Sequence, residues 1–264
     1  MKCGFLFIHL LTDLQRGRNL MTEQLVQSGR LQEKFCAQMP LIGDKAPAFE
    51  AETTKGMIRF PDDYAGKWVI LFSHPADFTP VCTSELFTFA KMTEEFREMD
   101  AELVGLSVDS VSSHLAWLKS IEEEIRFHGE QNVKIDYPVI ADVKMAVARK
   151  YGMIHPSVSD TKAVRAVFLI DPEAKIRAIL YYPLSTGRNF QEIKRLLAAL
   201  QVTDKYQVST PADWQPGEDV VVSAPTTLSE VMNEKNKQDG CDCGTWYFCT
   251  KKISEPENKT YGLH

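Results

Sequence analysis

One short segment of the chain, residues 74–82 with the sequence HPADFTPVC, carries the residue types best suited to chemistry. It follows a continuous apolar run (68–73, WVILFS) and precedes a stretch with helical spacing of apolar residues. Functional groups in open α/β sheets collect where strands end, and a cysteine in a helix's first turn faces unpaired N–H groups and the positive end of the helix dipole. A lone cysteine is more often a small buried hydrophobe, but this placement predicts that Cys82 is a reactive thiolate. Pro75 and Pro80 stiffen the loop that presents it.

A second group of candidate residues lies near the C-terminus, where Cys241, Cys243 and Cys249 are crowded together. Six cysteines in 264 residues are too few for a disulfide scaffold. Two chemistries fit the cluster: a thiol–disulfide pair, or a structural zinc site in which His264 would supply the fourth ligand. A residue at the chain end is a poor anchor for a metal, so we expect thiol chemistry, no metal and no cofactor.

Three aromatic residues, Trp246, Tyr247 and Phe248, separate the last two cysteines. Aromatic side chains bury a large area, so we expect these three to pack the C-terminal segment onto a folded surface. The remaining cysteines, Cys3 and Cys36, have no motif around them and are expected to be incidental.

The composition limits the classes of function. A net charge of −6 and a pI near 5.6 argue against a nucleic-acid partner, and no apolar run is long enough to span a membrane. Residues 4–11 (GFLFIHLL) resemble the apolar part of a signal peptide, but a histidine interrupts them and charged residues follow. With its low cysteine density, the protein is therefore expected in the cytoplasm.

The pattern of apolar residues predicts alternating strands and helices. Short apolar runs indicate strands at 68–73, 103–108, 164–170 and 176–182, and amphipathic stretches indicate helices at 83–99, 112–127, 143–151, 189–200 and 228–237. Asn189 or Thr186 is the expected N-cap of the helix at 189–200. This order is typical of an α/β fold with a mixed sheet.

The same pattern divides the chain into three parts. Residues 1–38 are an N-terminal extension that need not be ordered, and Met21 and Met39 offer later starts. Residues 39–200 form the folded core. Residues 201–264 are a C-terminal arm too small for a core of its own, so it must pack on its own core or on another subunit.

The motif Pro75-x-x-x-Thr79-x-x-Cys82 resembles the active-site signature of the peroxiredoxins, thiol-dependent peroxidases with a modified thioredoxin fold. Further segments look like landmarks of the same family in the same order: 109–111 (DSV), 114–117 (HLAW), 136–138 (DYP), the strand that contains Arg165, and 186–190 (TGRNF). The resemblance covers roughly residues 40–260. Its branch is similar to the one-Cys-type group with a long C-terminal arm, whose opening resembles residues 211–214 (PADW). It implies a thioredoxin-like fold with a central mixed sheet flanked by helices.

The resemblance also implies roles. Cys82 would attack hydrogen peroxide or an organic hydroperoxide and become a sulfenic acid. Thr79 would hydrogen-bond the thiolate and the peroxide, Pro75 would shield the thiolate from water, and Arg165 would stabilise it with a fixed cation.

Three other residues near the motif have less definite roles. Arg188 matches a second arginine of the family's pocket, although a surface arginine at a helix start is the alternative. His74 is expected to line the pocket, with a plain structural role as the alternative. Glu85 suits the helix's first turn and would orient Arg165 or Arg188.

The resemblance assigns the arm cysteines to recycling. Long-armed bacterial and archaeal peroxiredoxins have a similar Cys-x-x-Trp-Tyr-x-Cys arm with a resolving thiol, which here would be Cys249 or Cys243. It would form a disulfide with Cys82 that a thioredoxin-like protein or a small thiol then reduces. Since the arm is distant in sequence, the family's homodimer, often assembled into decameric rings, is implied.

Two alternatives remain from the sequence. A peroxide sensor or a redox-regulated holdase chaperone would use the same thiolate. A phospholipase activity of some one-Cys-type relatives is not expected, because the corresponding stretch, 64–68 (YAGKW), has no serine.

Overall fold

The structure is a computed structural model and describes residues 39–232 and 240–253. The N-terminal extension 1–38 with Cys3 and Cys36, residues 233–237 of the helix predicted at 228–237, and His264 lie outside the described residues.

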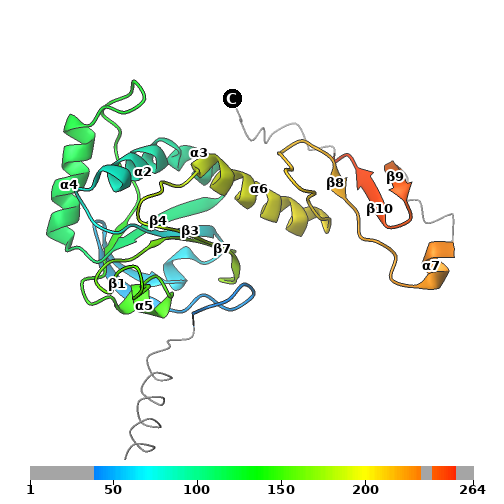
Figure 1. The fold of residues 1–264 in the computed structure, drawn as a ribbon, viewed down its shortest axis with the longest axis horizontal. Coiled ribbons are helices and arrows are strands. Elements are labelled where there is room, and N and C mark those ends of the chain that lie inside the picture. Colours follow the sequence, from blue (N-terminus) through cyan, green and yellow to red (C-terminus); the bar gives the residue numbers. More distant parts are fainter. Residues whose placement is uncertain (1–38, 233–239, 254–264) are drawn as a thin grey trace, which may run out of the picture.

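A seven-stranded mixed sheet forms the centre of the fold, in the order β2-β1-β5-β4-β3-β6-β7 (Figure 1). The three central strands β3, β4 and β5 run parallel, and the flanking pairs are antiparallel. This confirms the predicted α/β class with a mixed sheet. The strands are β1 (Phe49–Thr53), β2 (Gly56–Phe60), β3 (Trp68–Ser73), β4 (Ala101–Ser107), β5 (Val139–Ala141), β6 (Arg165–Ile170) and β7 (Ile176–Tyr182).

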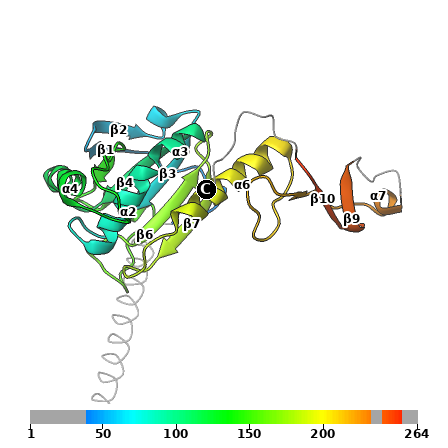
Figure 2. The ribbon, with the colours of Figure 1, turned by 90° about the horizontal axis from the view of Figure 1, so that it is seen from above.

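Helices cover both faces of this sheet (Figures 1 and 2). Every residue of β3 is buried because the strand lies between β4 and β6, which explains its continuous apolar sequence. Alternate side chains of a strand point to opposite faces: Ile70 and Phe72 pack beneath α2, α3, α4 and α6, whereas Val69 and Leu71 face α5. The helices are η1 (Asp62–Tyr64, a 3-10 turn), α2 (Pro80–Lys91), α3 (Thr93–Glu98), α4 (Val111–Glu124), α5 (Ala146–Lys150), α6 (Phe190–Tyr206) and α7 (Leu228–Met232).

The helix predicted at 83–99 is two helices, and it begins earlier. Proline suits the first helical position because its missing N–H would have no partner there, so α2 starts at Pro80. The helix breaks at Met92, where the neighbouring Thr93 hydroxyl donates to the Phe89 carbonyl at 3.1 Å. Back-bonding of this kind bends helices, and hydrophobic periodicity does not reveal it.

Two other helices differ in length from the prediction. α5 is shorter than 143–151, because Met145 adopts a left-handed conformation and the Asp142 carboxylate caps the backbone N–H groups of Ala146 and Ala148. α6 extends past the predicted end to Tyr206. The Asn189 side chain accepts from the backbone N–H of Glu192 and so confirms Asn189 as its N-cap.

The C-terminal arm forms a small antiparallel sheet of its own, in the order β8 (Val220–Val221), β10 (Phe248–Lys251) and β9 (Cys241–Thr245). Figures 1 and 2 show it beyond the end of α6, away from the large sheet. Trp214 and Val220 are buried in the cluster that includes α6 and attach the arm to the core. No helix in the described ranges is long and apolar enough to cross a membrane.

The expectation that the three arm aromatics pack onto a folded surface is wrong for the single chain. Trp246, Tyr247 and Phe248 are 56%, 59% and 49% exposed. They lie at the tip of the β9–β10 hairpin, where the antiparallel pairing carries them away from the anchor at Trp214.

Candidate active site

Cys82 lies at the edge of the sheet where β3 ends. It is the third residue of α2, so it occupies the first helical turn, and its side chain is fully buried. The loop 74–79 connects it directly to Ser73, the last residue of β3. The sequence prediction of a cysteine between a strand end and a helix start is confirmed.

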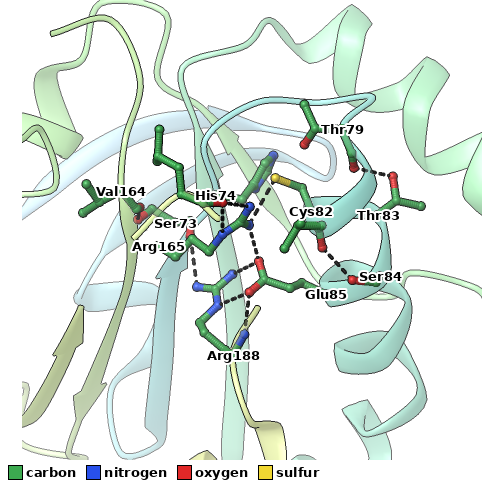
Figure 3. Close-up of polar contacts among 12 residues, drawn as sticks. Ser73, His74, Thr79, Cys82, Thr83, Ser84, Glu85, Val164, Arg165 and Arg188 are labelled. Atoms are coloured by element: carbon green, nitrogen blue, oxygen red, sulfur yellow. Dashed lines mark hydrogen bonds and ion pairs between the residues drawn. The ribbon is translucent and has the colours of Figure 1, made fainter. Parts of the chain in front are cut away.

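Arg165 is the closest charged partner recorded for the sulfur. Because β6 runs antiparallel to β3, its first residue lies at the same edge as the last residue of β3. Arg165 Nη1 donates to Cys82 Sγ at 3.3 Å, and Nε and Nη2 donate to the Leu184 carbonyl at 3.1 and 2.6 Å (Figure 3). The guanidinium is therefore held in one orientation, with an N–H directed at the sulfur.

Glu85 connects the two arginines of the site. It lies three residues after Cys82, on the same face of α2. Its Oε2 accepts from Arg165 Nη1 and from Arg188 Nη2, both at 2.7 Å, and its Oε1 accepts from the backbone N and Nε of Arg188, both at 2.9 Å. The sequence suggested one of these two partners, and the structure shows that Glu85 binds both.

The charges of this buried group leave one positive charge uncompensated. Arg165, Arg188 and Glu85 are each almost completely buried, and Glu85 is the anionic partner recorded for both guanidinium groups among the described residues. Burying an unpaired charge is costly. The excess positive charge lies on the side of the network that faces the sulfur, where Arg165 Nη1 contacts Cys82 Sγ.

Arg188 is a buried structural residue rather than a surface arginine at a helix start. Its Nη1 donates to the carbonyls of Ser73 and Ala166, at 2.9 and 3.0 Å, and so ties the end of β3 to β6. No hydrogen bond to Cys82 is recorded for it among the described residues. Glu85 is its charged partner rather than Cys82. A contact between Arg188 and the substrate stays a prediction.

The two remaining residues of the signature border the same loop. Thr79 occupies the N-cap position of α2, but its hydroxyl donates to the Ala76 carbonyl at 2.9 Å rather than to the Cys82 sulfur. The hydroxyl oxygen can still accept a hydrogen bond. Pro75 is buried beside His74.

His74 belongs to a buried network that sequence reasoning missed. Its Nε2 lies 3.0 Å from Asp77 Oδ1, and Asp77 Oδ2 lies 2.8 Å from Nδ1 of His114 on α4. The ring of His74 also packs against Trp117, with centroids 5.1 Å apart. Asp77 is in the same loop, whereas His114 is far along the chain, and nothing in their spacing indicates a shared site.

The three side chains of this network are the described residues best placed to hold a metal ion, since one ligand atom of each lies within 4.8 Å of the others. These atoms already bind one another. Burial would raise the pKa of Asp77, but hydrogen bonds from His114 and His74 outweigh it and lower that pKa. Burial lowers the pKa of His74. The hydrogen bonds among these three side chains account for the arrangement without a metal.

The two candidate resolving cysteines are bonded to each other. Cys243 and Cys249 face one another across β9 and β10 and form a disulfide, with Cα atoms 4.0 Å apart. Cys82 and Cys241 are free thiols. The disulfide is incompatible with the alternative in which all three arm thiolates bind zinc, and neither arm cysteine is in contact with Cys82.

Comparisons with known proteins agree with this geometry. The profile of the AhpC/TSA family matches residues 42–179, and that of the C-terminal domain of 1-Cys peroxiredoxin matches residues 199–237. A peroxiredoxin of Methanosarcina mazei is 63% identical over 218 residues, which cover 82% of this chain and all of the relative.

Solved structures also resemble the chain. A yeast mitochondrial 1-Cys peroxiredoxin, whose thiol is resolved via glutathione/thioredoxin systems, is 40% identical with a TM-score of 0.71, over 81% of this chain and 100% of its own. A mutant form of the peroxiredoxin 6 of Arenicola marina is 33% identical with a TM-score of 0.71, over 82% and 100% of the two chains. These matches confirm the predicted thioredoxin-like fold. The chain therefore belongs to the peroxiredoxins, in the group that carries the 1-Cys C-terminal domain, and is a thiol-dependent peroxidase.

Proposed function

We propose that Cys82 is the peroxidatic cysteine. Its thiolate attacks one oxygen of hydrogen peroxide or an organic hydroperoxide, the O–O bond breaks, and the second oxygen leaves as hydroxide or alkoxide and takes up a proton. The sulfur becomes a sulfenic acid and has given up two electrons. The observation that carries the proposal is the Arg165 N–H directed at a buried sulfur within a group that carries one excess positive charge.

The surrounding residues support this step in different ways. Arg165 stabilises the thiolate and then the charge on the leaving oxygen, because its N–H groups are already oriented before the reaction. Thr79 offers a hydroxyl oxygen at the start of α2, and Pro75 excludes water on the loop side. Arg188 holds the end of β3 against β6. His74 lines the pocket in which the peroxide binds.

The arm then resolves the sulfenic acid. A thiol of Cys243 or Cys249 attacks the Cys82 sulfenic sulfur, releases water and leaves a mixed disulfide. The second arm thiol displaces Cys82 from that disulfide, which yields the Cys243–Cys249 bond and a free Cys82 thiolate. The bond between the arm cysteines together with the free Cys82 supports this sequence. A thioredoxin-like protein or a small thiol reduces the arm disulfide in the cytoplasm.

A homodimer fits the same cycle, and a decameric ring of dimers extends it. The single chain keeps Cys82 fully buried while the arm sheet lies beyond α6 (Figure 1), and the exposed aromatic tip at Trp246 and Tyr247 offers an apolar surface to a second copy. The arm of one subunit then approaches Cys82 of the other.

Replacing Cys82 by serine tests the peroxidase proposal. We expect Cys82→Ser to abolish peroxide consumption with a thioredoxin or dithiothreitol as reductant, because an alcohol is not a nucleophile under these conditions. Cys241→Ser, which removes the other described free thiol, is the matched control and keeps full activity. Retained turnover in Cys82→Ser would show that another group performs the reaction.

The resolution step has a separate test. After one equivalent of peroxide, mass spectrometry of the wild type should find the Cys243–Cys249 bond. The two variants Cys243→Ser and Cys249→Ser should each give a different oxidation product of Cys82. The variant that keeps the resolving thiol accumulates a cross-link to Cys82, and the other accumulates sulfenic or sulfinic acid. If both variants keep normal thioredoxin-dependent turnover, the arm has no part in resolution and the mechanism uses one cysteine.

A peroxide sensor or a redox-regulated holdase would use the same thiolate, so turnover separates them from the enzyme. Many equivalents of peroxide consumed per subunit support a peroxidase. Oxidation that stops after one equivalent in the presence of reductant supports a sensor, and suppression of client-protein aggregation by the oxidised protein alone supports a holdase.

A further inference from the structure

The buried His74–Asp77–His114 network has a definite arrangement of protons. Asp77 lies between the two rings, and all three side chains are almost completely inaccessible to solvent. The network connects the loop after β3 to α4. In the described part of the chain no hydrogen bond joins Asp77 or His114 to Cys82, and His74 is the member of the network with a ring nitrogen left without a partner.

His114 faces a hydrogen-bond acceptor with each of its ring nitrogens. Its Nδ1 lies 2.8 and 3.0 Å from the two carboxylate oxygens of Asp77, and its Nε2 lies 3.2 Å from the backbone carbonyl of Ile140. Carboxylate and carbonyl oxygens only accept hydrogen bonds. Both ring nitrogens of His114 therefore face hydrogen-bond acceptors, and its Nδ1 lies against the Asp77 carboxylate.

The same reasoning fixes the tautomer of His74. Its Nε2 faces Asp77 Oδ1 at 3.0 Å and must donate. Burial, together with the charges of His114 and Arg188, lowers the pKa of His74, so its ring is neutral. A neutral ring with its proton on Nε2 leaves Nδ1 as a hydrogen-bond acceptor.

That acceptor has no partner among the described residues. Nδ1 of His74 is buried, and no hydrogen bond is recorded for it there. Leaving a buried acceptor unpaired costs free energy, and an exception of this kind in a site points to a ligand. In Figure 3 the ring of His74 projects toward the sulfur of Cys82.

We propose that Asp77 and His114 are positioning residues that hold His74 as an acceptor for the O–H of the bound hydroperoxide. The proton stays on the oxygen that Cys82 attacks and is found afterwards on the sulfenic acid, so His74 takes up no proton. The contact aligns the attacked oxygen with the sulfur while the other oxygen leaves toward Arg165. It requires a protonated hydroperoxide as substrate. The inference rests on the proposed role of Cys82.

The tautomer can be observed directly in the full-length protein. Solid-state 15N NMR of histidine-labelled wild type, with His74→Gln and His114→Gln for assignment, distinguishes protonated from unprotonated ring nitrogens. We expect an unprotonated Nδ1 and a protonated Nε2 for His74, and two protonated nitrogens for His114. A proton on Nδ1 of His74 would overturn the proposal without any kinetic measurement.

A pair of substitutions of similar size then separates hydrogen bonding from packing. Asp77→Leu removes the acceptor that faces His74, whereas Asp77→Asn keeps an amide oxygen in its place. We expect Asp77→Leu to slow the oxidation of reduced enzyme by hydrogen peroxide by about tenfold or more, and Asp77→Asn to restore most of the rate.

Alkylation of Cys82 by iodoacetamide, followed by mass spectrometry, is the control reaction, since this reagent offers no O–H to His74. It should proceed at the wild-type rate in both variants. If the rate of alkylation and the rate of oxidation by hydrogen peroxide fall equally, the substitution has disturbed the sulfur itself. That result would refute the positioning role. Cys82→Ser that remains active would refute the proposed function, yet would leave the tautomer of His74 as observed.

Discussion

The core and the arm hold their cysteines in opposite ways. Cys82 has no exposed surface, and it contacts a network whose members come from α2, β6 and the loop before α6. Cys243 and Cys249 are partly exposed on a sheet of three short strands, next to an aromatic hairpin tip. The core therefore fixes one sulfur in one environment, and the arm offers two sulfurs that solution reductants can reach.

This difference fits the roles proposed for the two sites. A nucleophile that must attack one oxygen in line gains from fixed donors and a dry, charged surrounding. A resolving thiol must change partners twice, so it gains from accessibility and from a segment that has few contacts with the core. In the described part of the arm, Trp214 and Val220, with the partly buried Val208 and Ile253, pack against the core cluster, whereas the β9–β10 tip is exposed.

The largest expected effect comes from removing the carboxylate that joins the two arginines. Glu85→Gln leaves the buried charges of Arg165 and Arg188 without a counterion, so we expect the free energy of unfolding to fall by about 3–5 kcal/mol. Oxidation by peroxide should also slow, because Arg165 Nη1, the atom that contacts Cys82, loses its ion pair with Glu85. Thermal melting and single-turnover oxidation measure the two effects.

The matched change in the arm is Asp242→Asn, which removes an exposed carboxylate from β9. We expect it to change the free energy of unfolding by less than about 0.5 kcal/mol. Similar losses in Glu85→Gln and Asp242→Asn would remove the contrast between the core and the arm.

A smaller effect concerns acid. Burial lowers the pKa of His74 below its ordinary value of 6.5. As the pH falls below 6.5, His74 therefore becomes protonated in the unfolded chain while it stays neutral in the folded chain. The contribution of His74 therefore makes the free energy of unfolding fall as the pH drops below about 6.5. His74→Gln should be less sensitive to acid between pH 7 and 5 in urea titrations. If His74→Gln has the same pH dependence of its free energy of unfolding as the wild type, His74 is more exposed to water than the structure shows.

Asp77 extends the same trend to lower pH. Its pKa is lowered in the folded protein, so its contribution to stability is present above the unfolded value of 3.8 and is lost as the pH falls further. Both groups belong to the core, and acid should therefore weaken the core before it affects the arm.

The smallest effect is expected at the hairpin tip. Trp246 is more than half exposed, so Trp246→Ser should leave the melting temperature of the single chain nearly unchanged. If the tip docks on a second copy, the same substitution weakens self-association in analytical ultracentrifugation. A drop of several degrees under monomeric conditions would show that the tip packs on its own chain.

Most of the fold was predictable because its central strand has a simple physical signature. The run 68–73 is apolar throughout since neighbours and helices cover it on every side, and a proline-bearing loop with a cysteine after it indicated a strand-to-helix connection. The break at Met92 was not predictable, because the apolar spacing continues across it and the Thr93 hydroxyl bond that accompanies it is invisible to hydrophobic periodicity. Aromatic content could not tell whether Trp246 would face its own core or solvent.

The site was predictable where its members share an element or the signature motif. Cys82 and Glu85 are three residues apart on one helix, and Arg165 was recognised through the family landmarks. Asp77 and His114 were missed because their contact depends on how α4 packs over the loop. The pairing of Cys243 with Cys249 depends on the register of β9 and β10, which their spacing alone does not fix.

β6 begins at Arg165 and ends in a turn at the opposite end of the strand, and its pairing with β3 decides where Arg165 lies. Asp171 holds that turn by accepting from the backbone N–H groups of Glu173 and Lys175, roughly 20 Å along the strand from the arginine. A shift of one residue in register would move Arg165 to the opposite face. The register of β6 against β3 therefore places Arg165 beside the sulfur, and we expect an insertion within β6 to inactivate the enzyme with every residue of the signature motif intact.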